Sequence, residues 1–474
     1  MSIDSNTVPD DFKSARVTPL YKKNGRHSVG NYRPVSILSV ASIFLEKAVY
    51  IQLEQYLTQN NLLYDFQSGF RSGYSTDTCL TYLTDYIKSQ LSIGNYTGMI
   101  LIDLQKAFDT VDHTILCAKL KNMGIQSVPW FRSYLTGRKQ IVSVNKTESE
   151  PLPISCGVPQ GSILCPLLFL CYVNDMSISV KCKLLLYADD SALLVSGKDP
   201  KSIAEELSAE LYSCSQWLVD NKLSLHLGKT ECILFGSKRR LKRVNNFKIV
   251  CNDHTIESVQ SVKYLGIHLD QCVSGVSTAN NILKKASSRL RFLYRQSSFL
   301  NKKSKCSLYS ALIQCHFDYS SSSWYQSLTQ NLKKKIQILQ NKAVRFILKR
   351  DSRAHIGQTE LDEVNMLNTS QRVTQLRLNH MFKIFRKTSP PYLQENFSRV
   401  TDQHKYITRD SQYNFYVPRV NSLTQNSFFY TATLEWNSLP SCIKEINNYN
   451  SFKKNVKKHL RNKSHLEEKC QFTK

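Results

Sequence analysis

Two adjacent aspartates, Asp189 and Asp190, lie between two short apolar runs of the chain. One run covers residues 184–187 and the other covers residues 192–195. Each run has the length and aliphatic composition of a buried strand, and the break between them suits a tight turn. Residues 183–195 therefore predict a β-hairpin that carries both carboxylates at its tip.

A third acid, Asp103, stands near the end of another apolar, β-rich segment, residues 96–104. If this strand and the hairpin are neighbours in one sheet, Asp103 meets Asp189 and Asp190. Phosphoryl transfer from a nucleotide uses two divalent ions about 4 Å apart, and Mg²⁺ prefers oxygen ligands. The three acids predict such a site, although an aspartate pair taken alone is equally typical of a solvated turn.

The rest of the chain mixes extended and helical segments, which indicates an α+β protein. Extended segments are expected within residues 15–38, at 231–235 and at 262–267, and helices at 39–60, 78–91 and 199–221. Beyond Asp270 the apolar residues recur every three or four positions, for example from Leu332 to Phe346, with lysines between them. This last part is expected to be chiefly helical.

Basic residues outnumber acidic ones by 63 to 37, which gives a net charge of +26. The excess is concentrated in residues 271–350, where fifteen Lys and Arg accompany one acid, Asp318. Solvation alone explains a general bias, but this clustering favours a surface for phosphate backbones. The basic stretch 238–243 is open to two interpretations, nuclear targeting or further nucleic-acid surface.

Other features narrow the cellular context. The longest apolar stretch, residues 161–173, is too short to span a bilayer, and the first thirty residues lack the apolar core of a secretion signal. The fourteen cysteines show neither Cys-x-x-Cys pairs nor the spacing of a zinc knuckle, which favours reduced thiols. The sequence thus predicts an intracellular protein, nuclear or cytoplasmic, that is not secreted and has no membrane partner.

Eight short motifs follow one another in a fixed order. They are ARVTPLYKK (15–23), NYRPVSIL (31–38), QSGFRSGYST (67–76), LIDLQKAFD (101–109), GVPQGSILCPLL (157–168), YADD (187–190), NKLSLHLGKT (221–230) and VKYLGIHLD (262–270). This ordered set resembles the motifs of reverse transcriptases of non-LTR (LINE-type) retrotransposons, and the resemblance covers about residues 12–270. An ordered series is far more specific than any one of its strings.

The resemblance implies a right-hand polymerase, with fingers, a palm built on an antiparallel sheet with helices, and a helical thumb. The corresponding ranges are fingers at 1–95, palm at 96–270 with parts of 110–155 fingers-like, basic thumb at 271–350, and a mostly helical C-terminal extension of unassigned role at 351–474. The earliest fingers segment of such elements precedes Phe12, so a truncated fingers region is expected.

The implied activity is RNA-directed DNA polymerisation. Its partners are an RNA template, a DNA primer, the RNA/DNA heteroduplex and deoxynucleoside triphosphates, and its cofactor is a pair of Mg²⁺ ions, with Mn²⁺ as an alternative. A rival hypothesis of another class remains, namely a truncated, catalytically impaired remnant that only binds nucleic acid.

Single residues acquire roles through the same resemblance. Asp103, Asp189 and Asp190 are the implied metal ligands, and Lys229 the implied acid that protonates departing pyrophosphate. Phe108 stands where the family places an aromatic ring that excludes the ribose 2′-hydroxyl. A buried core phenylalanine is the alternative interpretation of Phe108.

Substrate contacts are implied for three further groups of residues. They are the turn residues Gly157, Gln160 and Gly161 against nucleotide and template, the cations Arg33, Arg16 and Lys22 on the triphosphate, and a turn at Tyr264, Leu265 and Gly266 that positions the primer end. For Arg16 and Lys22 a solvated surface is the alternative. Cys165 replaces a glycine that is usual in the family.

Overall fold

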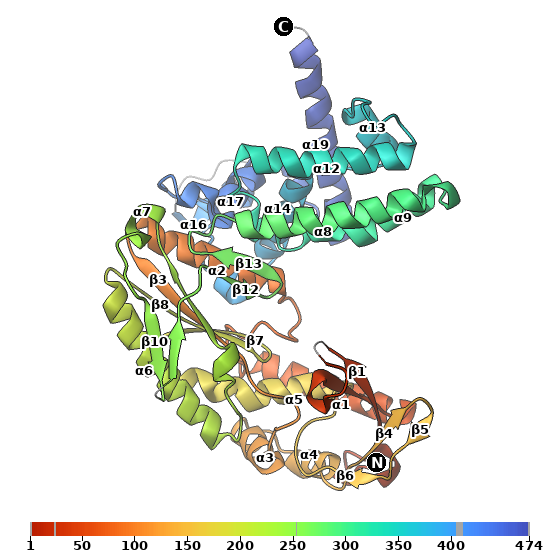
Figure 1. The fold of residues 1–474 in the computed structure, drawn as a ribbon, viewed down its shortest axis with the longest axis vertical. Coiled ribbons are helices and arrows are strands. Elements are labelled where there is room, and N and C mark those ends of the chain that lie inside the picture. Colours follow the sequence, from red (N-terminus) through yellow and green to blue (C-terminus); the bar gives the residue numbers. More distant parts are fainter. Residues whose placement is uncertain (1, 23–24, 253, 404–410, 473–474) are drawn as a thin grey trace.

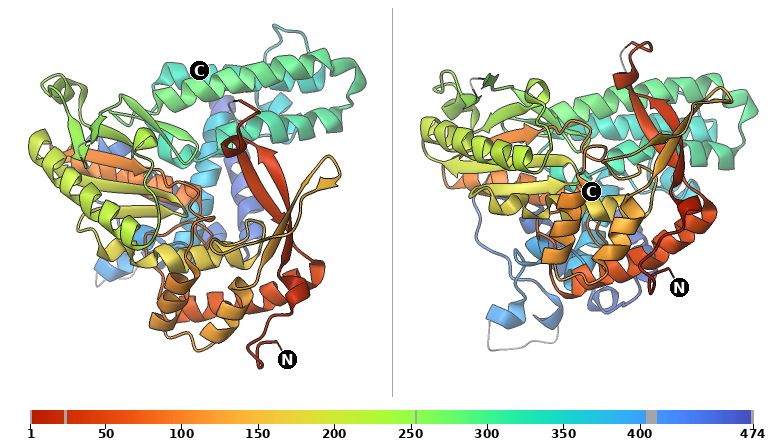
Figure 2. Two further views of the ribbon diagram at one scale, coloured as in Figure 1. Left: turned by 60° about the horizontal axis from the view of Figure 1, so that its bottom comes forward. Right: turned by 90° about the horizontal axis from the view of Figure 1, so that it is seen from below.

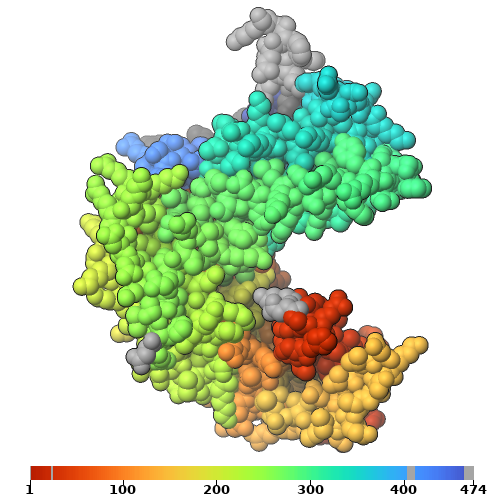
Figure 3. Space-filling view, in the orientation of Figure 1, coloured from red at the N-terminus to blue at the C-terminus, as the bar shows by residue number. Residues whose placement is uncertain are grey.

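The computed structural model describes residues 2–22, 25–252, 254–403 and 411–472, and these form three lobes (Figure 1). The fingers lie below, the palm at the left and the thumb above. In the space-filling view the hollow is bounded by the thumb above and the fingers below, and the palm closes it on one side (Figure 3). The α+β, right-hand fold expected from the sequence is confirmed.

An antiparallel sheet with strand order β7-β8-β3-β9 forms the centre of the palm. Its strands are β7 (Lys183–Tyr187), β8 (Asp190–Gly197), β3 (Tyr96–Ile102) and β9 (Glu231–Phe235). Successive side chains point to opposite faces of a sheet, and here both faces are apolar, so each faces its own core. The predicted hairpin and the strand before Asp103 are both confirmed.

Helices cover the two faces of this sheet. The helix α6 (Pro200–Asp220), capped by the Asp199 side chain, packs on β3 and β8 (Figure 2). The opposite face is covered by α2 (Thr76–Ser92), which the division at residue 95 assigned to the fingers. That assignment is corrected here, because Leu80, Leu83 and Ile87 pack in one core with the palm sheet and the thumb.

The fingers combine a small sheet with helices. Their strands are β1 (Ser14–Tyr21), β2 (Tyr32–Ile37), β4 (Lys139–Val144), β5 (Thr147–Glu148) and β6 (Leu152–Pro153), and the nearby helices are α1 (Val40–Gln59), α3 (His113–Asn122), α4 (Val128–Leu135) and α5 (Leu164–Val173). The strand β1 pairs antiparallel with β2 and parallel with β4. Residues far apart in sequence therefore share one sheet.

Two small hairpins lead from the palm to the thumb. They are formed by β10 (Lys248–Cys251) with β11 (His254–Glu257), and by β12 (Ser261–Tyr264) with β13 (Ile267–Asp270), after the short helix α7 (Lys238–Leu241). The single strand predicted at 262–267 is wrong. Leu265 and Gly266 both have positive φ, 42° and 86°, and turn the chain back on itself as a two-residue hairpin loop requires.

The remaining elements are helical, as predicted. The thumb contains α8 (Val276–Arg295), α9 (Lys302–Tyr309), α10 (Cys315–Asp318), α11 (Ser321–Trp324) and α12 (Gln330–Leu348). The extension contains α13 (Gln358–Glu363), α14 (Thr369–Phe385), α15 (Pro391–Gln394), α16 (Val400–Gln403), α17 (Phe428–Asn437), α18 (Ser441–Lys444) and α19 (Tyr449–Phe472). Phe382 and Trp436 belong to its aromatic core, whereas Leu361 of α13 packs into the core that palm and thumb share. No helix in the described part of the chain combines the length and hydrophobicity that a bilayer span requires.

Candidate active site

Strand register brings the three aspartates to one end of the palm sheet. Ile102 of β3 pairs with Ser191 of β8, so Asp103 leaves its strand at the edge where Asp190 begins the next one. Tyr187 pairs with Asp190, and the loop between them is Ala188-Asp189. The sequence required the strand before Asp103 to lie next to the hairpin, and in the structure the two are neighbours.

The electrostatics of this sheet end are those of crowded carboxylates. The pKa of Asp190 is raised from 3.8 to about 6, first by loss of solvent and then by the charges of Asp189 and Asp103. Burial also raises the pKa of Asp189, while the charges of Arg33 and Lys22 oppose this shift. The site therefore holds negative charge that nearby protein cations offset only in part.

Such a cluster fits divalent cations, since oxygen donors suit Mg²⁺ and a cation relieves repulsion between the carboxylates. Within the described ranges no three Asp, Glu, His or Cys side chains are already gathered at ligand distance. Asp103 instead forms a salt bridge of 3.2 Å with Lys229. The donor set fits a metal centre, and Lys229 supplies part of the missing positive charge.

The raised pKa of Asp190 makes a stability prediction for the metal-free chain. A folded-state pKa above the unfolded value means that ionisation of Asp190 destabilises the fold, fully above pH 6 and not at all below about pH 3.8. Replacing Asp190 by Asn is expected to raise the melting temperature by roughly 1–3 °C at pH 7.5, and by less at pH 4.5. Differential scanning fluorimetry in EDTA measures both values.

The control for this measurement is Asp11→Asn, because Asp11 is an exposed acid at the start of the fingers. Its substitution is expected to leave the melting temperature unchanged at both pH values. An equal gain for Asp190→Asn at pH 4.5 and pH 7.5 would contradict the assigned pKa.

Lys229 reaches Asp103 through the loop that follows α6. The backbone N–H of His226 donates to the carbonyl oxygen of Asp103 at 2.9 Å, and Gln105 N–H donates to Ser224 at 2.9 Å. These bonds fasten residues 224–230 along the end of β3. The side chain of Lys229 is about half exposed, so it pairs with Asp103 and remains open to solvent.

The turn at 157–161 is packed tightly against the chain itself. Gly157 N–H donates to Val111 O at 2.7 Å, and a Cβ on Gly157, whose φ is 86°, would lie 2.6 Å from Asp109 O. A Cβ on Gly161, whose φ is 128°, would overlap the carbonyl oxygen of Ser36. Both glycines are thus required by neighbouring backbone and by positive φ.

A hydrogen-bonded line of side chains joins the fingers to this turn. Arg33 Nε donates to Gln160 Oε1 at 3.0 Å, and Gln160 Nε2 donates to Asp109 Oδ1 at 2.7 Å. Arg33 and Lys22 are the two cations whose charges act on Asp189. Arg16 differs, because it forms a 2.7 Å salt bridge with Glu148 in the fingers sheet.

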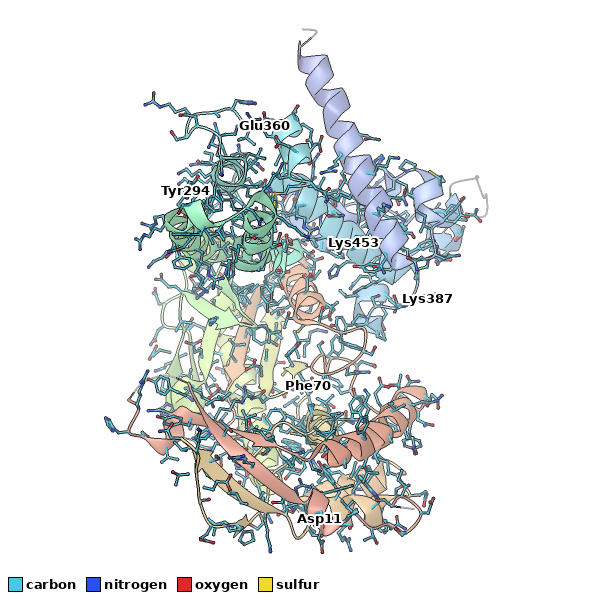
Figure 4. The ribbon with its side chains drawn as sticks, turned by 90° about the vertical axis from the view of Figure 1, so that its right-hand side faces the viewer. Asp11, Phe70, Tyr294, Glu360, Lys387 and Lys453 are labelled. Carbon is cyan, nitrogen blue, oxygen red and sulfur yellow. The ribbon has the colours of Figure 1, made fainter. Side chains whose placement is uncertain are left out.

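Phe108 is buried in the palm rather than free in the cleft. It is 7% exposed, and its ring lies 4.3 Å from that of Phe169. Its outer neighbour is Phe70, half exposed and 6.4 Å away edge-on. Seen from the open side of the cleft, Phe70 lies between the fingers below and the thumb above (Figure 4).

Sequence reasoning missed the residues that brace the hairpin of Asp189 and Asp190. Gln67 Oε1 accepts hydrogen bonds from the N–H groups of Ala188, at 3.0 Å, and Gly69, at 2.9 Å. Ser68 N–H donates to Leu186 O at 2.8 Å. Ala188 has a φ of 57°, a strained value for a residue with a Cβ, and the brace stabilises it. Position within the motif at 67–76 was the one available signal.

The first helix of the thumb presents a basic surface. Five bases of α8, namely Lys284, Lys285, Arg289, Arg291 and Arg295, are all exposed. Asp318 does not offset them, because it is paired at 2.7 Å with Arg372 of the extension. The basic surface predicted for residues 271–350 is present on the lobe that faces the fingers across the cleft (Figure 3).

A palm sheet with three clustered aspartates, set between fingers and a basic thumb, is the arrangement of a right-hand nucleic-acid polymerase. Residues 21–269 match the family model described as "Reverse transcriptase (RNA-dependent DNA polymerase)", so the chain belongs to this family. The resemblance inferred from the ordered motifs is confirmed.

Curated relatives are retrotransposon proteins. The chain is 29% identical to "Probable RNA-directed DNA polymerase from transposon BS" of Drosophila melanogaster, over 78% of this chain and 43% of that protein. It is 26% identical to "RNA-directed DNA polymerase from mobile element jockey" of the same species, over 73% of this chain and 38% of that protein. The chain thus spans about two fifths of the length of these relatives.

Among solved structures, telomerase from Candida albicans with a fragment of telomeric RNA is similar at a TM-score of 0.43 and 13% identity. The match covers 77% of this chain and 67% of the telomerase chain.

Proposed function

We propose that this chain is an RNA-directed DNA polymerase that adds deoxynucleotides to a primer 3′-hydroxyl. The observation that carries the proposal is the meeting of Asp103, Asp189 and Asp190 at one end of the palm sheet, in a chain of the reverse transcriptase family. Repulsion between these carboxylates is what a pair of divalent cations relieves.

Asp103 and Asp189 are the proposed ligands of both ions, with Asp190 assisting. Two Mg²⁺ ions, or Mn²⁺ in their place, would activate the primer hydroxyl and stabilise the charge of the leaving pyrophosphate. Lys229 is the proposed donor of a proton to that pyrophosphate, since its ammonium already lies 3.2 Å from Asp103. Its half-exposed position leaves it accessible to substrate.

The incoming nucleotide is proposed to lie between the fingers hairpin and the palm. Arg33 and Lys22 supply positive charge next to Asp189, and an arginine fork suits phosphate oxygens. The turn of Gly157, Gln160 and Gly161 is proposed to form the floor of this nucleotide site. Gln160 hydrogen-bonds to both Arg33 and Asp109 there. Arg16 lies on β1, the strand that ends just before Lys22, and its pairing with Glu148 must open before it reaches a triphosphate.

The template–primer is proposed to lie along the thumb. The exposed bases of α8 carry the positive charge that backbone phosphates require. Contacts to phosphates carry no sequence information, which suits an RNA/DNA heteroduplex of any composition. Leu265 and Gly266 are proposed to support the primer end. Their turn is fixed to the thumb, because Tyr319 Oη donates to Leu265 O at 2.6 Å.

Phe108 is proposed to select the sugar. In Phe108→Val the missing ring is expected to raise the use of ribonucleotides relative to deoxynucleotides by about tenfold or more, the range typical of steric pockets. Single-nucleotide extension with each nucleotide class measures this ratio.

Phe169→Val is the matched control, because Phe169 supplies the other ring of the same stack. Both variants are expected to lose roughly 1–3 kcal/mol of stability. An unchanged nucleotide ratio in Phe108→Val would leave Phe108 as a core residue only.

The deciding experiment is extension of a DNA primer annealed to an RNA template, with Mg²⁺ and all four deoxynucleotides. Processive addition that stops in EDTA supports the polymerase. Tight heteroduplex binding without extension, in the wild type and in every variant, would instead support the binding remnant.

A further inference from the structure

One buried tyrosine of the C-terminal extension reaches the palm. Tyr392 of α15 is 3% exposed, and its ring lies nearly parallel to that of Phe66, at 5.5 Å and 13°. Two further rings, Tyr82 at 5.1 Å and Tyr74 at 6.0 Å, meet it at steep angles. The extension therefore completes an aromatic cluster in the segment that leads into α2.

The hydroxyl of Tyr392 joins two polar side chains of that segment. It donates to Thr78 Oγ1 at 3.2 Å and lies 3.0 Å from Ser68 Oγ. Thr78 directs its own proton to the carbonyl oxygen of Ser75, at 2.8 Å. A hydroxyl carries one proton, so Ser68 donates to Tyr392, and the three hydroxyls form one ordered chain.

Ser68 also belongs to the brace of the catalytic hairpin. Its backbone N–H donates to Leu186 O at 2.8 Å, while Leu186 N–H donates to Phe66 O at 3.1 Å. The neighbouring Gln67 holds Ala188, the residue before Asp189. A path of direct contacts thus runs from Tyr392 through Ser68 and Gln67 to the hairpin tip.

Hydrogen bonds hold the extension to α2, so Tyr392 has a fixed position relative to the palm. Asp85 of α2 accepts hydrogen bonds from the first N–H groups of α17, those of Phe428 at 2.9 Å and Phe429 at 2.8 Å. Lys88 Nζ donates to Asn426 O at 2.9 Å. The side chains that make these bonds are buried or half-buried. They tie the extension to α2, the helix that follows the brace residues Gln67 and Ser68.

We propose that Tyr392 is a positioning residue for the hairpin that carries Asp189 and Asp190, which makes the C-terminal extension part of the support of the active site. The proposal rests on the proposed polymerase function, since that activity is what requires a fixed hairpin. A displacement of 1 Å at a reacting group costs a rate factor of about 10², so losing one bond in this path has a measurable effect.

Tyr392→Phe is the informative variant, because it keeps the ring and removes only the hydroxyl. Its kcat for nucleotide addition is expected to fall about tenfold, the equivalent of one neutral hydrogen bond, with the nucleotide KM within twofold. Ser68→Ala is expected to give the same loss. The double variant is expected to lose no more than either single one, because both break the same contact.

Tyr74→Phe is the matched control, since it removes a hydroxyl from the same aromatic cluster and this hydroxyl forms no hydrogen bond with the described residues. Its kcat is expected to stay within twofold of the wild type. Equal losses in the two tyrosine variants, or additive losses in the double variant, would overturn the proposal.

Hydrogen–deuterium exchange of the peptide spanning residues 184–190 gives a readout independent of polymerisation. Exchange there is expected to be faster in Tyr392→Phe than in the wild type, and unchanged in Tyr74→Phe. Unaltered exchange in Tyr392→Phe would overturn the positioning role even in an active enzyme. Faster exchange in a chain without extension activity would support the brace and reject the polymerase function instead.

Discussion

Replacing Asp189 and Asp190 together by asparagine is expected to lower primer extension by about 10³-fold or more. Metal ligation is worth several kcal/mol of transition-state stabilisation, and each 1.36 kcal/mol is a factor of about ten in rate. Asparagine keeps the size of each side chain but removes the negative charge that attracts the ions. Single-turnover extension at saturating template–primer measures the loss.

Heteroduplex binding by the same double variant is the contrasting measurement. The thumb bases lie apart from the hairpin, so heteroduplex affinity of the double variant is expected to stay within about twofold, with an unchanged salt dependence. The matched control is Asp10→Asn with Asp11→Asn, another adjacent aspartate pair, exposed in the fingers. Extension by the hairpin variant at more than about a tenth of the wild-type rate would contradict the assignment of these acids.

Gly69→Ala is expected to reduce extension by about 10²-fold, through displacement of the hairpin. A Cβ on Gly69 would overlap the backbone nitrogen of Ala188 and lie 3.0 Å from its Cα and Cβ. Backbone atoms cannot give way as a flexible side chain does, so Ala188 and the adjoining Asp189 must move. The φ of Gly69 is not in the positive range, so the effect is expected to be steric alone.

The control for this substitution is Gly30→Ala in the fingers, where the nearest atom to an added Cβ is Ser28 Oγ at 3.8 Å. Its extension rate is expected to match the wild type. The melting temperature of both variants is measured as well, so that a loss of activity from hairpin displacement is distinguished from a loss caused by unfolding. Wild-type activity in Gly69→Ala would show that the hairpin tolerates a different position.

Local patterns predicted the elements that carry the three aspartates. The apolar runs around Asp189 and Asp190 and the strand before Asp103 were visible because period and length suffice to identify short buried strands. The ordered motifs then supplied the fold. The resemblance implied a turn at Tyr264, Leu265 and Gly266, whereas the residue pattern alone predicted one strand over 262–267, since leucine at positive φ is uncommon and gives no local signal.

The contacts that hold the site were not predictable in the same way. Gln67 meets Ala188 across 121 positions of sequence, and Arg16 finds Glu148 only because β1 and β4 pair in parallel. Gly157 and Gly161 were expected to make room for substrate, whereas the nearest atoms to their missing side chains belong to Asp109 and Ser36. Such partners depend on register and packing, which composition does not encode.

The bond between Ser68 and Tyr392 spans 324 positions of the chain, and this distance has a kinetic consequence. Non-local contacts form late in folding because a long loop must close first. At ribosomal rates of about 5–20 residues per second, roughly 15–65 s separate the synthesis of these two residues. A nascent chain that already carries all eight motifs still lacks this closure, so translation time delays the onset of full activity in the proposed polymerase.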